Sequence, residues 1–182
     1  MPLNPDTSEL SSRKQEKTIF IETGTGDGHG IQCALDANFK EIYSVELSKE
    51  LYEKAKERFK EYPNVHLICG SSEIELPKIL EKVEKEFILW LDAHWSGGPY
   101  IGERMHLYLP KELNAIKKYS HKFENSIIMI DDMNHYINDY QFCKSIENLV
   151  NDIKKTGDIK YHKSLFATPV SYTHLRAHET LI

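Results

Sequence analysis

One short segment constrains the fold of this chain more than any other, because a buried-strand pattern in it runs directly into a glycine-rich turn. Residues 18–22 (TIFIE) form a short, largely apolar run, which is typical of a strand covered on both faces of a sheet. Residues 23–30 (TGTGDGHG) then carry glycine at every second position, and a helical pattern follows over about 30–38. This order predicts the first unit of a parallel α/β sheet, with a ligand bound where the strand ends.

The same alternation of strand and helix patterns continues along the chain. Further strands are predicted at 41–46 (EIYSVE), 65–69 (VHLIC), 87–91 (FILWL) and 126–130 (SIIMI), and a sixth begins near 159–163. Between them we expect helices after Ser48 as N-cap, over 76–83 started by Pro77, from Pro110 onward, and over 141–156. The predicted fold class is therefore α/β: one Rossmann-like domain over 18–168, with a central, mostly parallel sheet in the order 3-2-1-4-5.

Composition and charge restrict the classes of partner. The 182 residues suffice for one α/β domain, and the net charge is −5 with no cluster of lysine and arginine. Nucleic-acid binding is therefore disfavoured, because neutralising a phosphate backbone requires clustered cations. Three cysteines without CxxC spacing indicate free thiols in a reducing compartment. Since no apolar run has the length of a membrane span or the character of a signal peptide, we expect a cytoplasmic protein.

The two ends of the chain differ from this central domain. Residues 1–17 are polar and are interpreted as a flexible lead-in with a short helix near 8–14. Residues 169–182 lack periodicity, and the segment 170–180 (VSYTHLRAHET) resembles the translated read-through of a sequencing adaptor. On that hypothesis the tail is not native, the native sequence ends near Thr168, and the last strands of the domain are missing. Strand five would then have an open edge.

Two cofactors compete for the glycine turn. A dinucleotide site requires GxGxxG, whose third glycine allows a close approach of the helix, but counting from Gly24 puts His29 at that position. The spacing that fits is acid-x-Gly-x-Gly-x-Gly, formed by Glu22, Gly24, Gly26 and Gly28 with Thr25 inside it. This pattern resembles motif I of the class I S-adenosylmethionine (SAM)-dependent methyltransferases. The resemblance implies that these residues wrap the methionine part of SAM.

The next two strand ends supply further candidate cofactor contacts. Glu46 closes the second strand, where a carboxylate can accept hydrogen bonds from two ribose hydroxyls. After the third strand the methyltransferase family often has an acidic residue near the adenine, whereas this chain has Gly70, Ser71 and Ser72. Ser71 and Ser72 are therefore the candidates for the adenine contact, and the departure from the family pattern leaves that contact in doubt.

Acidic residues end strands four and five. Asp92 and the pair Asp131 and Asp132 are expected side by side, and such carboxylates repel one another unless a cation or proton lies between them. Oxygen ligands favour Mg²⁺ or another hard divalent cation, so the three are candidate metal ligands. The pattern resembles metal-dependent O-methyltransferases. In the alternative interpretation, Asp92 acts without a metal and Asp132 caps the following segment.

A candidate general base follows strand four. His94 lies two residues after Asp92, where a neutral imidazole can take a proton from an attacking hydroxyl. The alternative for His94 is packing against Trp95. Asp92 and His94 are therefore the candidate catalytic residues.

Over residues 18–163 the chain resembles class I methyltransferases, and within them a group of small bacterial enzymes often encoded near polysaccharide genes. The runs that carry the resemblance are FIETGT, IYSVELSKELYEKAKERF, LWLDAHWSGG and IIMIDD. The resemblance implies SAM as the cofactor and O-methylation of a small molecule or saccharide. Two alternatives stay open: an NAD(P)-dependent oxidoreductase, and a SAM-binding protein without catalytic activity.

Overall fold

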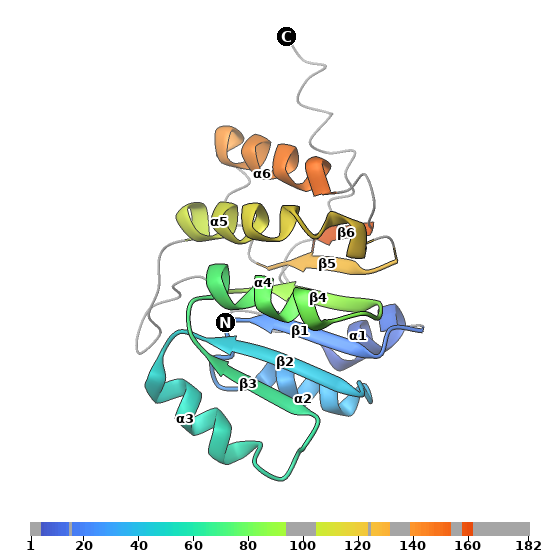
Figure 1. Cartoon of the computed structure of the whole chain (residues 1–182), viewed down its shortest axis with the longest axis vertical. Coiled ribbons are helices and arrows are strands. Elements are labelled where there is room, and N and C mark those ends of the chain that lie inside the picture. The colour runs from blue at the N-terminus through green and yellow to red at the C-terminus, as the bar shows by residue number, and fades with distance from the viewer. Residues whose placement is uncertain are drawn as a thin grey trace.

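The computed structural model describes residues 5–14, 16–93, 105–123, 125–131, 139–153 and 158–161. Their centre is a sheet of six parallel strands in the order β3-β2-β1-β4-β5-β6 (Figure 1). The strands are β1 (Ile19–Thr23), β2 (Glu41–Glu46), β3 (Val65–Cys69), β4 (Phe87–Leu91), β5 (Ile127–Ile130) and β6 (Asp158–Tyr161). The α/β class and the expected order 3-2-1-4-5 are confirmed.

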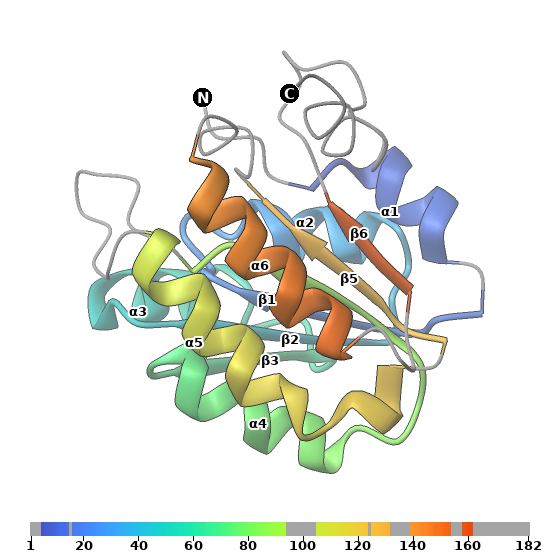
Figure 2. The ribbon, with the colours of Figure 1, turned by 90° about the horizontal axis from the view of Figure 1, so that it is seen from above.

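Helices cover both faces of this sheet. They are α1 (Thr7–Lys14), α2 (His29–Asp36), α3 (Lys49–Arg58), α4 (Ser72–Lys82), α5 (Met105–Lys117) and α6 (Tyr140–Ile153), with a 3-10 turn, η1 (Ser120–Phe123), before β5. Side chains of α1, α2 and α3 pack in one apolar core, and those of α4, α5 and α6 pack in the other. Figure 2 shows α4, α5 and α6 side by side along their face. The result is a three-layer sandwich.

Alternate side chains of each central strand enter opposite cores. Phe20 and Trp90 lie in the core with α1, α2 and α3, whereas Ile21 and Leu89 lie in the core with α4, α5 and α6. All five residues of β1 and all five of β4 are buried. A strand buried on both faces has no polar side to present to water, which explains why these segments are largely apolar and do not alternate.

Two helices begin earlier than their prolines predict. Pro77 lies inside α4, which starts after Ser71, and Pro110 lies inside α5. In α4 the amides of Ile74 and Glu75 both donate to the Ser71 carbonyl, and the acidic Glu73 and Glu75 stand in the first turn, where the helix dipole favours them. Proline removes one backbone donor, but the turn before it is already satisfied, so the prediction that each proline starts its helix was wrong.

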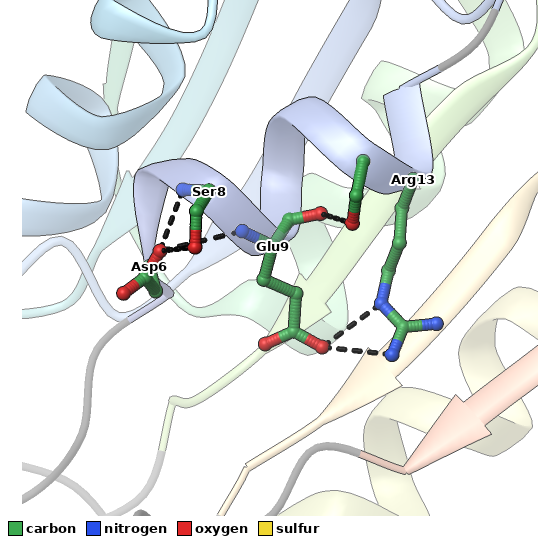
Figure 3. Close-up of polar contacts among 5 residues, drawn as sticks. Asp6, Ser8, Glu9 and Arg13 are labelled. Atoms are coloured by element: carbon green, nitrogen blue, oxygen red, sulfur yellow. Dashed lines mark hydrogen bonds and ion pairs between the residues drawn. The ribbon is translucent and has the colours of Figure 1, made fainter.

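The N-terminal lead-in, expected to be flexible apart from a short helix, is ordered as a helix between residues 7 and 14. Here α1 forms close to the expected 8–14 range, and its Leu10 is fully buried in the core beside α2. Asp6 caps the helix, since its Oδ1 accepts from the amides of Ser8 at 2.5 Å and Glu9 at 3.3 Å (Figure 3). One turn on, Arg13 Nε donates to Glu9 Oε1 at 2.9 Å. The helix is therefore part of the domain.

The edge of the sheet beyond β5 is also covered. We expected an open edge there, but β6 pairs with β5 in parallel, with Ile128 opposite Ile159 and Met129 opposite Lys160. The hydrogen-bonding groups of β5 are thus used on both sides, by β4 and by β6. Among the residues that the structure describes, no helix is both long and apolar enough to cross a bilayer.

Candidate functional site

The turn between β1 and α2 is built from glycines in the left-handed region. Gly24, Gly26 and Gly28 have φ of +83°, +55° and +83°, values that L-residues with a side chain adopt only with strain. At Gly24 space is limiting as well, because a Cβ there would stand 2.5 Å from the Asp92 carbonyl oxygen. The turn therefore lies directly against the end of β4, and glycine is required for both conformation and contact.

Neighbouring segments hold this glycine loop (residues 24–28) in place. The Gly24 amide donates to the Val45 carbonyl at 2.9 Å, and the Gly28 amide donates to the Thr25 carbonyl at 2.8 Å. From α3, Arg58 Nη1 donates to the Asp27 carbonyl at 2.7 Å. The loop is therefore tied to β2, to itself and to α3.

Glu46 joins the glycine loop to the start of α3. Its Oε2 accepts from the Gly26 amide at 2.9 Å, while its Oε1 accepts from the Ser48 amide at 2.7 Å. Ser48 is the N-cap of α3, as predicted, with Leu51 donating to its hydroxyl at 3.4 Å. An ionised carboxylate has about four lone-pair sites. Glu46, at 5% exposure, therefore keeps one acceptor site on each oxygen after serving the two amides.

Glu22 occupies a different position from the one expected of a cofactor contact. Its side chain is 2% exposed and lies beneath the glycine loop, where Oε1 accepts from the Ser44 hydroxyl at 2.7 Å. Burial raises the pKa of Glu22 to about 8, and the nearby carboxylates of Glu46 and Asp27 push it in the same direction. Its assignment as a SAM contact stays a prediction, and its surroundings favour a buried neutral acid.

The turn after β3 is linked to α5. The Ser71 hydroxyl lies 2.7 Å from the Tyr108 hydroxyl, and the buried Ser72 hydroxyl donates to Glu112 Oε1 at 2.5 Å. Ser71 is thus at the strand end where adenine is expected, while Ser72 packs between two helices. Sequence patterns gave no signal for Tyr108 or Glu112, because their partners are about forty positions away.

Asp92 and Asp131 end neighbouring strands, as the sequence predicts. The Asp92 amide donates to the Thr23 carbonyl at 3.2 Å, and the Asp131 amide donates to the Leu91 carbonyl at 3.1 Å. Asp131 is fully buried and Asp92 is partly exposed. His94 and Asp132 lie outside the described residues. Within the described part of the chain no group of three potential ligands is placed to hold a metal ion, so the metal site stays a prediction.

Comparison with known proteins identifies the fold. No protein-family model and no curated protein sequence matches the chain. The solved structure of SAH-bound methyltransferase PaMTH1 from Podospora anserina matches with a TM-score of 0.54 and 20% identity, covering 81% of this chain and 64% of that one. The yeast methylglyoxal/isovaleraldehyde reductase Gre2, complexed with NADPH, matches with a TM-score of 0.56 and 13% identity, covering 80% and 56%.

These similarities place the chain in the Rossmann-like α/β class, which methyltransferases and nucleotide-dependent reductases share. The chain spans less than two thirds of the length of either structure. At 20% and 13% identity the likeness establishes the fold and leaves the activity to the residues of the site.

Proposed function

We propose that this chain is a SAM-dependent methyltransferase that methylates a hydroxyl of a small molecule or saccharide. The observation that carries the proposal is the contact between Glu46 and the Gly26 amide. It places the strand-two carboxylate against a loop of left-handed glycines with the spacing acid-x-Gly-x-Gly-x-Gly. In the proposed site, the residues that would bind the ribose and the methionine part of SAM are therefore adjacent.

The donors and acceptors around this loop fit SAM. The two unused acceptor sites of Glu46 suit the two ribose hydroxyls, in charge-assisted hydrogen bonds. Ser71, with its hydroxyl linked to Tyr108, stands at the neighbouring strand end and suits the polar edge of adenine. Left-handed glycines allow the methionine part of SAM to approach the backbone without a Cβ in the way.

When bound, SAM supplies a methyl group on a sulfonium, and an acceptor oxygen attacks its carbon as the carbon–sulfur bond breaks. Asp92 stands next to the glycine loop, because the chain at Asp92 touches Gly24. His94 follows it by two residues. In the proposed reaction His94 takes the hydroxyl proton and Asp92 orients the acceptor or the imidazole. Alignment of the acceptor with the methyl group supplies the remaining effect.

An NAD(P)-dependent oxidoreductase is the second candidate, and two observations favour it. The order β3-β2-β1-β4-β5-β6 is that of the dinucleotide-binding sheet. In addition, Gly30 lets α2 approach Glu22 of β1 closely. Gly30 stands one position after the place that the third glycine occupies in a dinucleotide-binding loop, which is His29 in this chain. The absence of glycine at position 29 therefore separates the two cofactors less sharply than the sequence alone indicates.

Calorimetric titration of the folded protein with SAM, SAH, NADH and NADPH tests the proposal. We expect SAM and SAH to bind, and Glu46→Ala to weaken SAM binding about 10–100-fold, because hydrogen bonds to a charged group contribute about 1.5–3 kcal/mol. Glu50→Ala is the matched control, since Glu50 lies exposed on α3 and contacts Lys54. Binding of NADPH without SAM would establish the reductase instead. SAM binding without methyl transfer to any acceptor would indicate a non-catalytic SAM-binding protein.

A further inference from the structure

A group of hydrogen-bonded side chains lies beneath the glycine loop. The role inferred for it here rests on the function proposed above. We propose that Glu22, Ser44 and Thr25 are positioning residues, which form a buried hydrogen-bonded chain that holds the glycine loop in its binding conformation without touching the cofactor. Ser44 has no role in the sequence pattern, since it stands in the middle of β2.

The three side chains are connected in series. Ser44 is fully buried, and its hydroxyl donates to Glu22 Oε1 at 2.7 Å. The same hydroxyl lies 2.6 Å from Thr25 Oγ1. One of these two hydroxyls donates to the other, because each can act as donor or acceptor. Thr25 belongs to the glycine loop, so this series of hydrogen bonds connects the loop to the middle of β2.

The other carboxyl oxygen of Glu22 is enclosed by α2. A Cβ on Gly30 would stand 1.9 Å from Glu22 Oε2 and 3.1 Å from its carboxyl carbon. Glycine is favoured at position 30 because a side chain would lack space there. Backbone conformation is not the reason, since the φ of Gly30 is not positive. The same Cβ would stand 3.4 Å from Pro5 Cγ. With a strand hydroxyl on one oxygen and a helix against the other, the carboxyl group is oriented into the protein.

The charge state of Glu22 follows from what surrounds it. Burial is the main cause that raises its pKa to about 8, and Glu46 on β2 and Asp27 in the loop add to the effect, while the Ser44 hydrogen bond opposes it. From α2 the facing titratable group is the Cys33 thiol, whose own pKa is raised by burial. Glu22 is therefore uncharged at neutral pH. Above pH 8 it ionises beside Glu46, and the repulsion loosens the loop.

The first test uses the cofactor-free protein. The folded-state pKa of about 8 lies above the ordinary value of 4.5, so the folded state holds the proton more tightly. The stabilisation is complete below pH 4.5 and is lost as the pH rises to 8. We expect the unfolding temperature of the wild type to fall over this range relative to Glu22→Gln, a neutral isostere. Parallel profiles for the two proteins would refute a neutral buried Glu22 whether or not SAM binds.

The second test measures SAM affinity against pH. If only the form with neutral Glu22 binds, the competent fraction falls about tenfold between pH 7 and pH 9, and the dissociation constant rises about tenfold. Glu22→Gln is expected to bind SAM at pH 7 like the wild type and to lose this pH dependence. Ser44→Ala, which breaks the chain, is expected to weaken SAM binding at pH 7. Glu50→Gln is the exposed control.

The outcomes separate this proposal from the proposed function. A loss of SAM affinity by Glu22→Gln of tenfold or more at pH 7 would show that the charged carboxylate contacts the cofactor, and would overturn the positioning role. Unchanged affinity in Ser44→Ala would also overturn it. If the wild type binds no SAM, the cofactor proposal fails, but the pH profile of unfolding still decides whether Glu22 is a neutral anchor.

Discussion

At the scale of single residues, Gly24 combines a left-handed conformation with a close approach to backbone atoms, whereas the equally close approach at Gly28 is to a side chain, the Phe59 ring. Its φ of +83° places it in the left-handed region, and a Cβ would stand 2.5 Å from a backbone oxygen of Asp92, which cannot move without shifting β4. Gly70 offers a contrast: a Cβ there would meet the Glu75 side chain at 2.8 Å, and its φ is not positive.

We therefore predict that Gly24→Ala is much more harmful than Gly70→Ala. A residue forced into a sparsely populated φ region costs about 1–3 kcal/mol. At Gly24 the clash with the Asp92 backbone adds to this cost. At Gly70 the nearest contact is the Glu75 side chain, which can rotate away from an added methyl group. Chemical denaturation measures the free energies of unfolding, and a titration with SAM measures the effect on the loop. Equal losses for the two variants would contradict the conformation described for the loop.

Residue roles were predictable only where they follow from position along a strand. Glu46 was identified because acids at the end of the second strand are recognisable in sequence, and it does contact the loop. Glu22 was identified by the same logic, but its surroundings depend on Ser44 and Gly30, which approach it from β2 and α2. Sequence spacing does not report which way a side chain at a strand end turns.

At the scale of elements, α5 is fastened to the β3–α4 turn by two hydrogen bonds. Tyr108 contacts Ser71 at 2.7 Å and Glu112 contacts Ser72 at 2.5 Å, one helical turn apart on α5. These bonds bring α5 beside the strand end where we expect adenine. The position of α5 would therefore shape the proposed cofactor site, although none of its residues resembles a cofactor motif.

We predict that Tyr108→Phe destabilises the protein by about 0.5–1.5 kcal/mol, the net contribution of one hydrogen bond. The aromatic ring and its contact with Lys111 are retained in this variant. A double-mutant cycle with Ser71→Ala isolates the interaction, since the two changes are expected to be less than additive. Strict additivity would show that the two hydroxyls do not interact.

Element boundaries were predictable where a cap residue marks them and not where proline does. Ser48 was identified as the N-cap of α3 and is confirmed. The sequence predicts helix starts at Pro77 and Pro110, but α4 begins five residues before Pro77 and α5 begins at Met105. In α5 the buried Tyr108 and Leu109 precede Pro110. Their burial contributes enough to extend the helix past a missing backbone donor, and burial of this kind is a tertiary effect.

At the scale of the whole molecule, the sheet was predictable because its strands are apolar runs of similar length joined by helices. The order of its first five strands follows from the general rules for α/β folds. The sixth strand carried a weaker signal, since DIKY contains two charged residues. Its pairing with β5 extends the sheet on the side opposite β3, and β5 becomes an interior strand.

This arrangement predicts different effects for two C-terminal deletions. A variant that ends at Thr168 lacks only the tail, residues 169–182, that contains the segment resembling adaptor read-through. We expect this variant to unfold at the same temperature as the full chain. A chain ending at Ile153 also removes β6 and exposes the hydrogen-bonding edge of β5. Losing a few backbone hydrogen bonds, at about 0.5–1.5 kcal/mol each, lowers the unfolding temperature by at least about 3 °C. The exposed edge also favours aggregation, which light scattering detects.

If removal of 169–182 destabilised the protein as much as removal of 154–182, the tail would belong to the fold. If neither deletion had an effect, β6 would contribute nothing to the sheet.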